Sequence, residues 1–93
     1  MTEWFFVSAW TEKNETEIHF EIANEDGEQY FFSIVSSVIE RALPKQGTET
    51  LDRFYYAEED MLSLAVMIID EEMVETDELY IITPALFEKY YAG

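Results

Sequence analysis

The chain has 93 residues, of which 48% are apolar and 16% aromatic, so it fits one folded domain and is not a disordered acidic tail. Asp and Glu number 21 against 5 Lys and Arg, which gives a formal net charge of −16 at pH 7. This charge excludes binding to nucleic acid or anionic lipid through a basic surface. Cysteine is absent, which excludes disulfides and thiolate chemistry.

No apolar run approaches the roughly 18 residues that a membrane-spanning helix needs. The longest run, Leu64–Ile69, is far too short. The N-terminus lacks the basic start and apolar block of a signal peptide. We therefore expect a cytoplasmic protein that does not contact a membrane.

The first predicted strand, Trp4–Trp10, is almost continuously apolar. Strict alternation places Trp4, Phe6 and Trp10 on one face and Phe5, Val7 and Ala9 on the other. A strand that is apolar on both faces is typical of a central strand or an interface. We therefore expect Trp4, Phe6 and Trp10 to form the seam of a possible homodimer.

A second strand is predicted at Thr16–Ile22, after a polar hairpin loop at Thr11–Glu15. Alternation points Ile18, Phe20 and Ile22 inward, and Glu15, Glu17, His19 and Glu21 outward. The only histidine, His19, is thus expected to be solvated. The Asp26-Gly27 pair predicts a tight turn, and Gln29–Phe32 should return as a third strand.

Apolar residues then recur with helical spacing from Ile34 to Leu43, which predicts a helix ended by Pro44 and Gly47. Ser33, Ser36 or Ser37 is expected to cap it, and Ser37 with Glu40 has capping-box spacing. The segment Tyr30–Phe32 suits either the strand or the start of this helix.

The second half is predicted to contain a short strand at Arg53–Tyr56, then acids at Glu58–Asp60 that favour a helix N-terminus. A helix with apolar positions from Met61 to Ile69 follows, with a buried strand at Leu64–Ile69 as the alternative. Leu79–Ile82 indicates a strand, and Thr83-Pro84 the start of a terminal helix. The expected fold is a single α+β domain, an N-terminal antiparallel β-meander packed against two to three helices.

The charge is concentrated in two parts of the chain. Residues 1–28 hold eight acids and one base, residues 29–57 three of each, and residues 58–93 ten acids and one base. Most charge runs are merely solvated surface, but small domains typically carry a net charge of only about 2–8. We therefore predict a partner-binding surface. Its predicted residues are Glu15, Glu17, Glu21, Glu58, Glu59, Asp60, Asp70, Glu71, Glu72, Glu75, Asp77 and Glu78.

The total charge is of the order of that on duplex DNA of the same length, which holds roughly 18 phosphates in 30 Å. In size, charge and aromatic content the chain resembles the small acidic nucleic-acid-mimic inhibitors of phages and mobile elements, such as anti-restriction and anti-CRISPR proteins. The acidic runs Glu15–Glu21, Glu58–Asp60 and Asp70–Glu78 carry this resemblance. It implies an inhibitor that occupies the nucleic-acid-binding surface of a basic protein.

Catalytic and metal-binding patterns are weak. Carboxylate pairs are too numerous for any one pair to be informative, and glycine-rich phosphate loops are absent. The Asp70–Glu78 run lacks the glycine and spacing of an EF-hand, and a single histidine gives zinc or a catalytic triad little to use. We expect no catalytic residues, no metal site and no cofactor.

The leading hypothesis is therefore a non-enzymatic acidic inhibitor of a nucleic-acid-binding protein or nuclease. The alternative is a toxin immunity protein or antitoxin that binds one cognate basic toxin. A third hypothesis is a housekeeping domain whose acidity is only solubilising.

Overall fold

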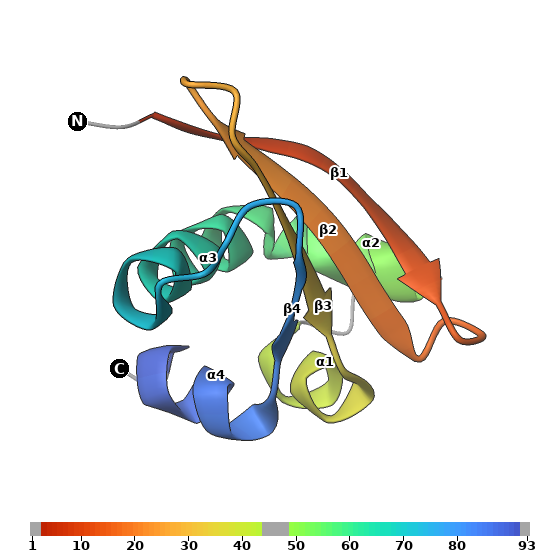
Figure 1. The fold of residues 1–93 in the computed structure, drawn as a ribbon. Coiled ribbons are helices and arrows are strands. Elements are labelled where there is room, and N and C mark those ends of the chain that lie inside the picture. Colours follow the sequence, from red (N-terminus) through yellow and green to blue (C-terminus); the bar gives the residue numbers. More distant parts are fainter. Residues whose placement is uncertain (1–2, 44–48, 92–93) are drawn as a thin grey trace.

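The computed structural model describes residues 3–43 and 49–91 and shows an α+β fold (Figure 1). Along the chain the elements are β1 (Trp4–Glu12), β2 (Glu17–Asn24), β3 (Gln29–Ile34), α1 (Ser36–Ala42), α2 (Thr50–Tyr56), α3 (Glu58–Glu72), β4 (Leu79–Ile82) and α4 (Pro84–Tyr91). The α+β class and the N-terminal meander are confirmed. Within the described residues, four helices pack against the sheet, rather than two to three.

The four strands form one mixed sheet in the order β1-β2-β3-β4. The first three are antiparallel neighbours, as their short connections require, and β4 returns parallel to β3 after three helices. Alternate residues of β2 and β3 are fully buried beneath the helices, including Ile18, Phe20 and Phe32. These side chains form one core with Phe54 of α2 and Met61 of α3. On the opposite face of the sheet, no helix of the described residues is packed (Figure 1).

A β-bulge in β1 changes which side chains face the core. Phe6 pairs with Ile22 and Ser8 with Glu21, so Val7 is an extra residue in the ladder. Beyond it Ala9 lies opposite the buried Phe20, while Trp10 lies opposite His19 on the other face. The prediction that Trp4, Phe6 and Trp10 share one face is therefore wrong, because the bulge reverses the alternation. Trp4 and Phe6 pack against the core, whereas Trp10 does not face it.

The hairpin loop between β1 and β2 is shorter than predicted. Lys13, Asn14 and Glu15 have φ values of 52°, 57° and 64°, the left-handed region that turns use. Glu15 therefore belongs to the turn and does not extend the outward row of β2. The inward alternation of Ile18, Phe20 and Ile22 is confirmed, with each side chain fully buried.

The predicted Asp-Gly turn joins β2 to β3. Gly27 has a φ of +83°, which a residue with a side chain would adopt only under strain. Asn24 is buried and organises the turn, because its Oδ1 accepts hydrogen bonds from the backbone N–H groups of Asp26 and Glu28, both at 3.0 Å. The third strand extends to Ile34, so Tyr30–Phe32 belongs to the strand.

Two local predictions in the middle of the chain are wrong. Val35, whose side chain cannot cap, is the N-cap of α1, and no serine side chain caps it. Arg53–Tyr56 is helical in α2, where the backbone N–H of Glu49 donates to Asp52 Oδ2 at 3.1 Å at the helix start. Only Phe54 of that aromatic run is buried. Pro44 and Gly47, the predicted helix terminators, lie outside the described residues.

The last two helices follow the sequence closely. Leu64–Ile69 is helical within α3, and Glu58, Glu59 and Asp60 form its first turn as predicted. Thr83 caps α4, because its Oγ1 accepts a hydrogen bond from the Leu86 N–H at 3.2 Å. Within the described ranges, none of the helices combines the length and apolarity needed to cross a bilayer.

Candidate functional site

The few cations of this protein are used internally. Each of the four lysines and arginines within residues 3–43 and 49–91 forms an ion pair with a carboxylate. The pairs are Lys13–Glu17 at 3.2 Å, Arg53–Glu40 at 3.0 Å, Lys89–Glu72 at 3.1 Å and Arg41–Glu88. Three of these pairs join different helices. The described cations therefore hold the fold together and leave most of the acids unneutralised.

Arg53 is the most enclosed of these cations, with a side chain only 14% exposed. Its Nη1 donates to Glu40 Oε1, and its Nη2 donates to the backbone carbonyls of Ile39 and Leu43 at 3.1 and 3.0 Å. These carbonyls lie at the C-terminal end of α1, where a cation is favoured by the helix dipole. Arg53 thus fastens α2 to α1.

A second set of side-chain contacts joins α4 to α3 and α1. Glu72, at the end of α3, accepts hydrogen bonds from the Tyr90 hydroxyl and from Lys89 Nζ. These bonds hold the pKa of Glu72 below its usual value, and the same carboxylate raises the pKa of Tyr90. Arg41 pairs with Glu88 and lies 6.0 Å from the ring centre of Phe87.

A different set of acids gathers at one end of the sheet. The Glu25 N–H donates to the Glu3 carbonyl at 3.1 Å, and the Asp77 N–H donates to the Gln29 carbonyl at 3.1 Å. These two backbone bonds bring together the start of β1, the β2–β3 turn and the loop that enters β4 (Figure 1). We call the exposed acids of these segments the acidic end: Glu3, Glu25, Asp26, Glu28, Asp77 and Glu78. None of the four described lysines and arginines lies in these segments.

Sequence reasoning named Asp77 and Glu78 but missed Glu3, Glu25, Asp26 and Glu28. The Asp-Gly signal placed three acids in a turn, but nothing in the sequence connects that turn with residues 77–78. The carboxylate of Glu28 accepts a hydrogen bond from Asn24 Nδ2 at 2.8 Å. The acidic end carries five further exposed carboxylates and no described cation in the same segments.

The other predicted site residues fall into separate places. Glu15 and Glu17 lie at the opposite end of the β1–β2 hairpin from Glu25, because Glu12 pairs with Glu17 there and Trp4 with Asn24 at the acidic end. Asp70 and Glu71 are exposed in the last turn of α3, and Glu75 is exposed in the loop that follows. Glu72 is turned toward α4. The twelve predicted residues therefore do not form one continuous surface.

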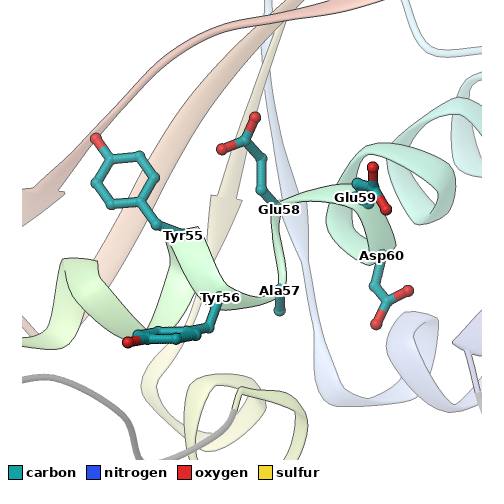
Figure 2. A pocket seen from close by; sticks show the side chains of 6 residues that line it. All are labelled: Tyr55, Tyr56, Ala57, Glu58, Glu59 and Asp60. Atoms are coloured by element: carbon teal, nitrogen blue, oxygen red, sulfur yellow. The ribbon is translucent and has the colours of Figure 1, made fainter.

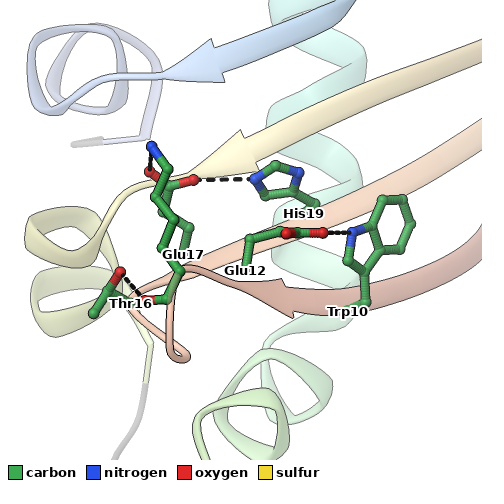
Figure 3. Close-up of polar contacts among 6 residues, drawn as sticks. Trp10, Glu12, Thr16, Glu17 and His19 are labelled. Atoms are coloured by element: carbon green, nitrogen blue, oxygen red, sulfur yellow. Dashed lines mark hydrogen bonds and ion pairs between the residues drawn. The ribbon is translucent and has the colours of Figure 1, made fainter.

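The carboxylates that point outward from β2 have side-chain partners within the protein (Figure 3). Glu17 contacts His19 Nε2 at 3.1 Å and Lys13 Nζ at 3.2 Å, and these contacts lower the pKa of Glu17. Glu21 accepts a hydrogen bond from Gln29 Nε2 at 2.8 Å. The His19 side chain is only 15% exposed and contacts the Trp10 ring, so the expectation that His19 is solvated is wrong.

Glu58, Glu59 and Asp60 line a shallow pocket of about 430 Å³ with Tyr55, Tyr56 and Ala57. Figure 2 shows Tyr55 and Glu58 on one side of the α2–α3 junction and Tyr56 and Asp60 on the other. These side chains do not converge on one point. The acids at this position also have a structural role, because negative charge stabilises the first turn of α3.

The helix-free face of the sheet is unusually apolar at its two edges. Phe5 and Val7 of β1 are 46% and 49% exposed, and Leu79 and Ile81 of β4 are each 51% exposed. The register places Phe5, Leu79 and Ile81 on this face. Between these edges lie Glu17, His19, Glu21 and Gln29. We call this the open face of the sheet.

Among the residues that the structure describes, no group of three His, Cys, Asp or Glu is arranged to hold a metal ion. No protein-family model, curated protein or solved structure matches the chain significantly.

Proposed function

We propose that this protein is a non-enzymatic inhibitor that occupies the basic nucleic-acid-binding surface of a target protein. The target is a nucleic-acid-binding protein or a nuclease, and the setting is the cytoplasm. In this proposal the acidic end makes the first electrostatic contact, and the acids of the α3 C-terminus and the following loop extend it.

One observation carries the proposal: the separation of the two kinds of charge. The described cations are bound to carboxylates at helix contacts and in one hairpin, while the acidic end displays six exposed carboxylates from three chain segments. A surface needed only for solubility gains from mixed charges, which repel each other less. Collecting like charges at one place costs stability, and a cationic partner offsets that cost.

The dimensions support a nucleic-acid mimic. The longest axis of the described chain is 35 Å, over which duplex DNA carries roughly 20 phosphates at about one per 1.7 Å. The formal charge of −16 is of similar size. Binding to a cationic groove would be fast and strongly weakened by salt, because it depends on charge complementarity.

The experiment uses the protein as bait in an extract of its native host, followed by competition with DNA. A captured target should release a labelled DNA duplex as this protein is added, and binding should weaken steeply as salt rises. Simultaneous binding of DNA and this protein would contradict mimicry. Capture only of proteins without a basic surface would contradict the proposal as a whole.

A matched pair of variants locates the surface. The acidic-end variant carries Glu3→Gln, Glu25→Gln, Asp26→Asn and Glu78→Gln. The control carries Glu12→Gln, Glu15→Gln, Glu49→Gln and Glu59→Gln, and has the same net charge. We expect the first to lose about 100-fold or more in affinity and the second about 10-fold or less, because nearby charges contribute most. Equal losses would place the contact elsewhere.

The open face favours the second candidate, a toxin immunity protein or antitoxin. A decoy needs little more than charge, whereas the half-exposed Phe5, Leu79 and Ile81 provide apolar area for one cognate partner. Under this alternative, Leu79→Ser with Ile81→Ser would strongly weaken target binding and leave its salt dependence unchanged. Retention of full affinity would contradict it.

A further inference from the structure

A groove of about 440 Å³ lies beside the acidic end, between the start of β1 and the solvent flank of α3. Its lining residues are Trp4, Leu62, Ser63, Val66, Met67 and Asp70. Trp4 follows Glu3 directly, so the groove is continuous with the acidic end.

The walls of the groove are apolar, although they lie on a strongly charged protein. Leu62 and Val66 are half-buried, and Met67 is 44% exposed in the middle of α3. The Trp4 ring rests against Tyr30, with the ring centres 5.5 Å apart, so it is held as one wall of the groove. The groove therefore offers an aromatic surface and a flexible methionine to an incoming side chain.

The other lining groups favour a cation. Asp70 belongs to the last turn of α3, which contains Asp70, Glu71 and Glu72 and no base. The helix dipole disfavours acids at this position and favours a positive group. Glu72 receives Lys89 on the α4 side, but no cation from the described part of the chain pairs with Asp70. The groove thus combines apolar walls with an acidic rim that lacks its counter-charge.

We propose that this groove binds an arginine side chain of the cationic partner. The inference rests on the proposed function and identifies the partner side chain that would bind at that surface. The methylene stem would lie along Val66 and Met67, and the guanidinium would stack on Trp4 and bond Asp70. Arginine fits better than lysine, because its planar, weakly hydrated head stacks on aromatic rings and pairs with carboxylates through two hydrogen bonds.

A second copy of the chain is a poor source of this arginine. Arg41 is bound to Glu88, and Arg53 to Glu40 and two backbone carbonyls. Two copies would also bring together surfaces that each carry a net charge of −16. The arginine therefore comes from a different protein.

The test uses Trp10→Phe protein, in which Trp4 is the remaining tryptophan and its emission reports on the groove. The probes are acetylated hexa-arginine and hexa-lysine, with a fluorescent label for anisotropy, at about 50 mM salt. We expect hexa-arginine to change Trp4 emission and to bind about 10-fold more tightly than hexa-lysine. The Met67 methyl NMR shift in unsubstituted protein provides the same reading without a substitution.

Matched variants separate the groove from the general charge. Asp70→Asn should weaken hexa-arginine binding about 10-fold, and Glu71→Gln, which removes one charge outside the groove, about threefold or less. Trp4→Leu, measured by anisotropy, should abolish the preference for arginine, because it removes the ring on which the guanidinium stacks. Met73→Ser, at an exposed residue outside the groove, should preserve it.

The outcomes distinguish the groove from the proposed function. Equal binding of both peptides with unchanged Trp4 emission would overturn the arginine site and leave the acidic decoy standing. Absence of binding by either peptide would overturn both. A larger Trp4 response to an alternating lysine–leucine hexapeptide would show that an aliphatic anchor fills the groove, and would also overturn the arginine assignment.

Discussion

The corner where α1, α2 and α4 meet and the acidic end of the sheet use charge in opposite ways. At the helical corner, Arg53 and Arg41 each bind a carboxylate on another helix. At the acidic end, exposed carboxylates from three segments meet with no described cation in those segments. The net charge of this protein is therefore divided between acids that stabilise the fold and acids that are displayed.

Among these variants, we expect substitution of Arg53 to change the free energy of unfolding most. Arg53→Ala removes an ion pair and two hydrogen bonds to the C-terminal carbonyls of α1, so we expect a loss of about 2–4 kcal/mol in the free energy of unfolding. Urea denaturation measures the loss. Lys13→Ala is the matched control, because the Lys13 side chain is 73% exposed and its ion pair with Glu17 is worth under about 1 kcal/mol. Similar losses for the two variants would contradict the claim that Arg53 stabilises the fold more than Lys13 does.

Substitution of acids in the two regions should give a smaller difference in the free energy of unfolding. Glu40→Gln with Glu88→Gln breaks two helix-to-helix ion pairs whose carboxylates are exposed, and should lower the free energy of unfolding by about 1 kcal/mol. Glu25→Gln with Glu78→Gln removes the same charge from the acidic end. It should leave stability unchanged or raise it by about 0.5 kcal/mol, since repulsion falls. Equal destabilisation of both would show that the acidic end also holds the fold.

The smallest expected effect is on the pH dependence of stability. The pKa of Glu72 is lowered in the folded protein, so its stabilising contribution is present above its unfolded pKa and is lost as pH falls through the folded value. The pKa of Tyr90 is raised, so its contribution is present below its unfolded pKa and is lost as pH rises through the folded value.

Glu72→Gln should therefore flatten both limbs of the stability curve, below about pH 4.5 and above about pH 10. Thermal melts across pH measure this. Glu71→Gln, in the same helical turn, should retain both limbs. An unchanged acid limb in Glu72→Gln would contradict the assigned role of the Tyr90 and Lys89 contacts.

Periodicity predicted most elements of this fold because most of its strands and helices have one buried face. The alternation of Ile18, Phe20 and Ile22 and the Thr83-Pro84 start of α4 are local signals, and both are confirmed. The prediction of a strand at Arg53–Tyr56 is wrong, because three consecutive aromatic residues suit either a strand or a helix. The deciding contacts, Arg53 to the α1 carbonyls and Phe54 in the core, are tertiary.

The candidate site was less predictable, for two physical reasons. The bulge at Val7 adds one residue to β1 and moves Trp10 to the open face, which no alternation rule anticipates. The acidic end is assembled by backbone bonds from Glu25 to Glu3 and from Asp77 to Gln29, between segments far apart in sequence. The density of acids along the chain identified Asp77 and Glu78 but not their neighbours in space.

The parallel pairing of β4 with β3 has a consequence for the order of folding. β1, β2 and β3 join through short turns, so their pairing closes only small loops and can form early. β3 ends at Ile34 and β4 begins only at Leu79, so that pair must close a loop containing three helices. From this topology we expect β4 and α4 to dock last, and the loop that completes the acidic end to take its place only in that final step.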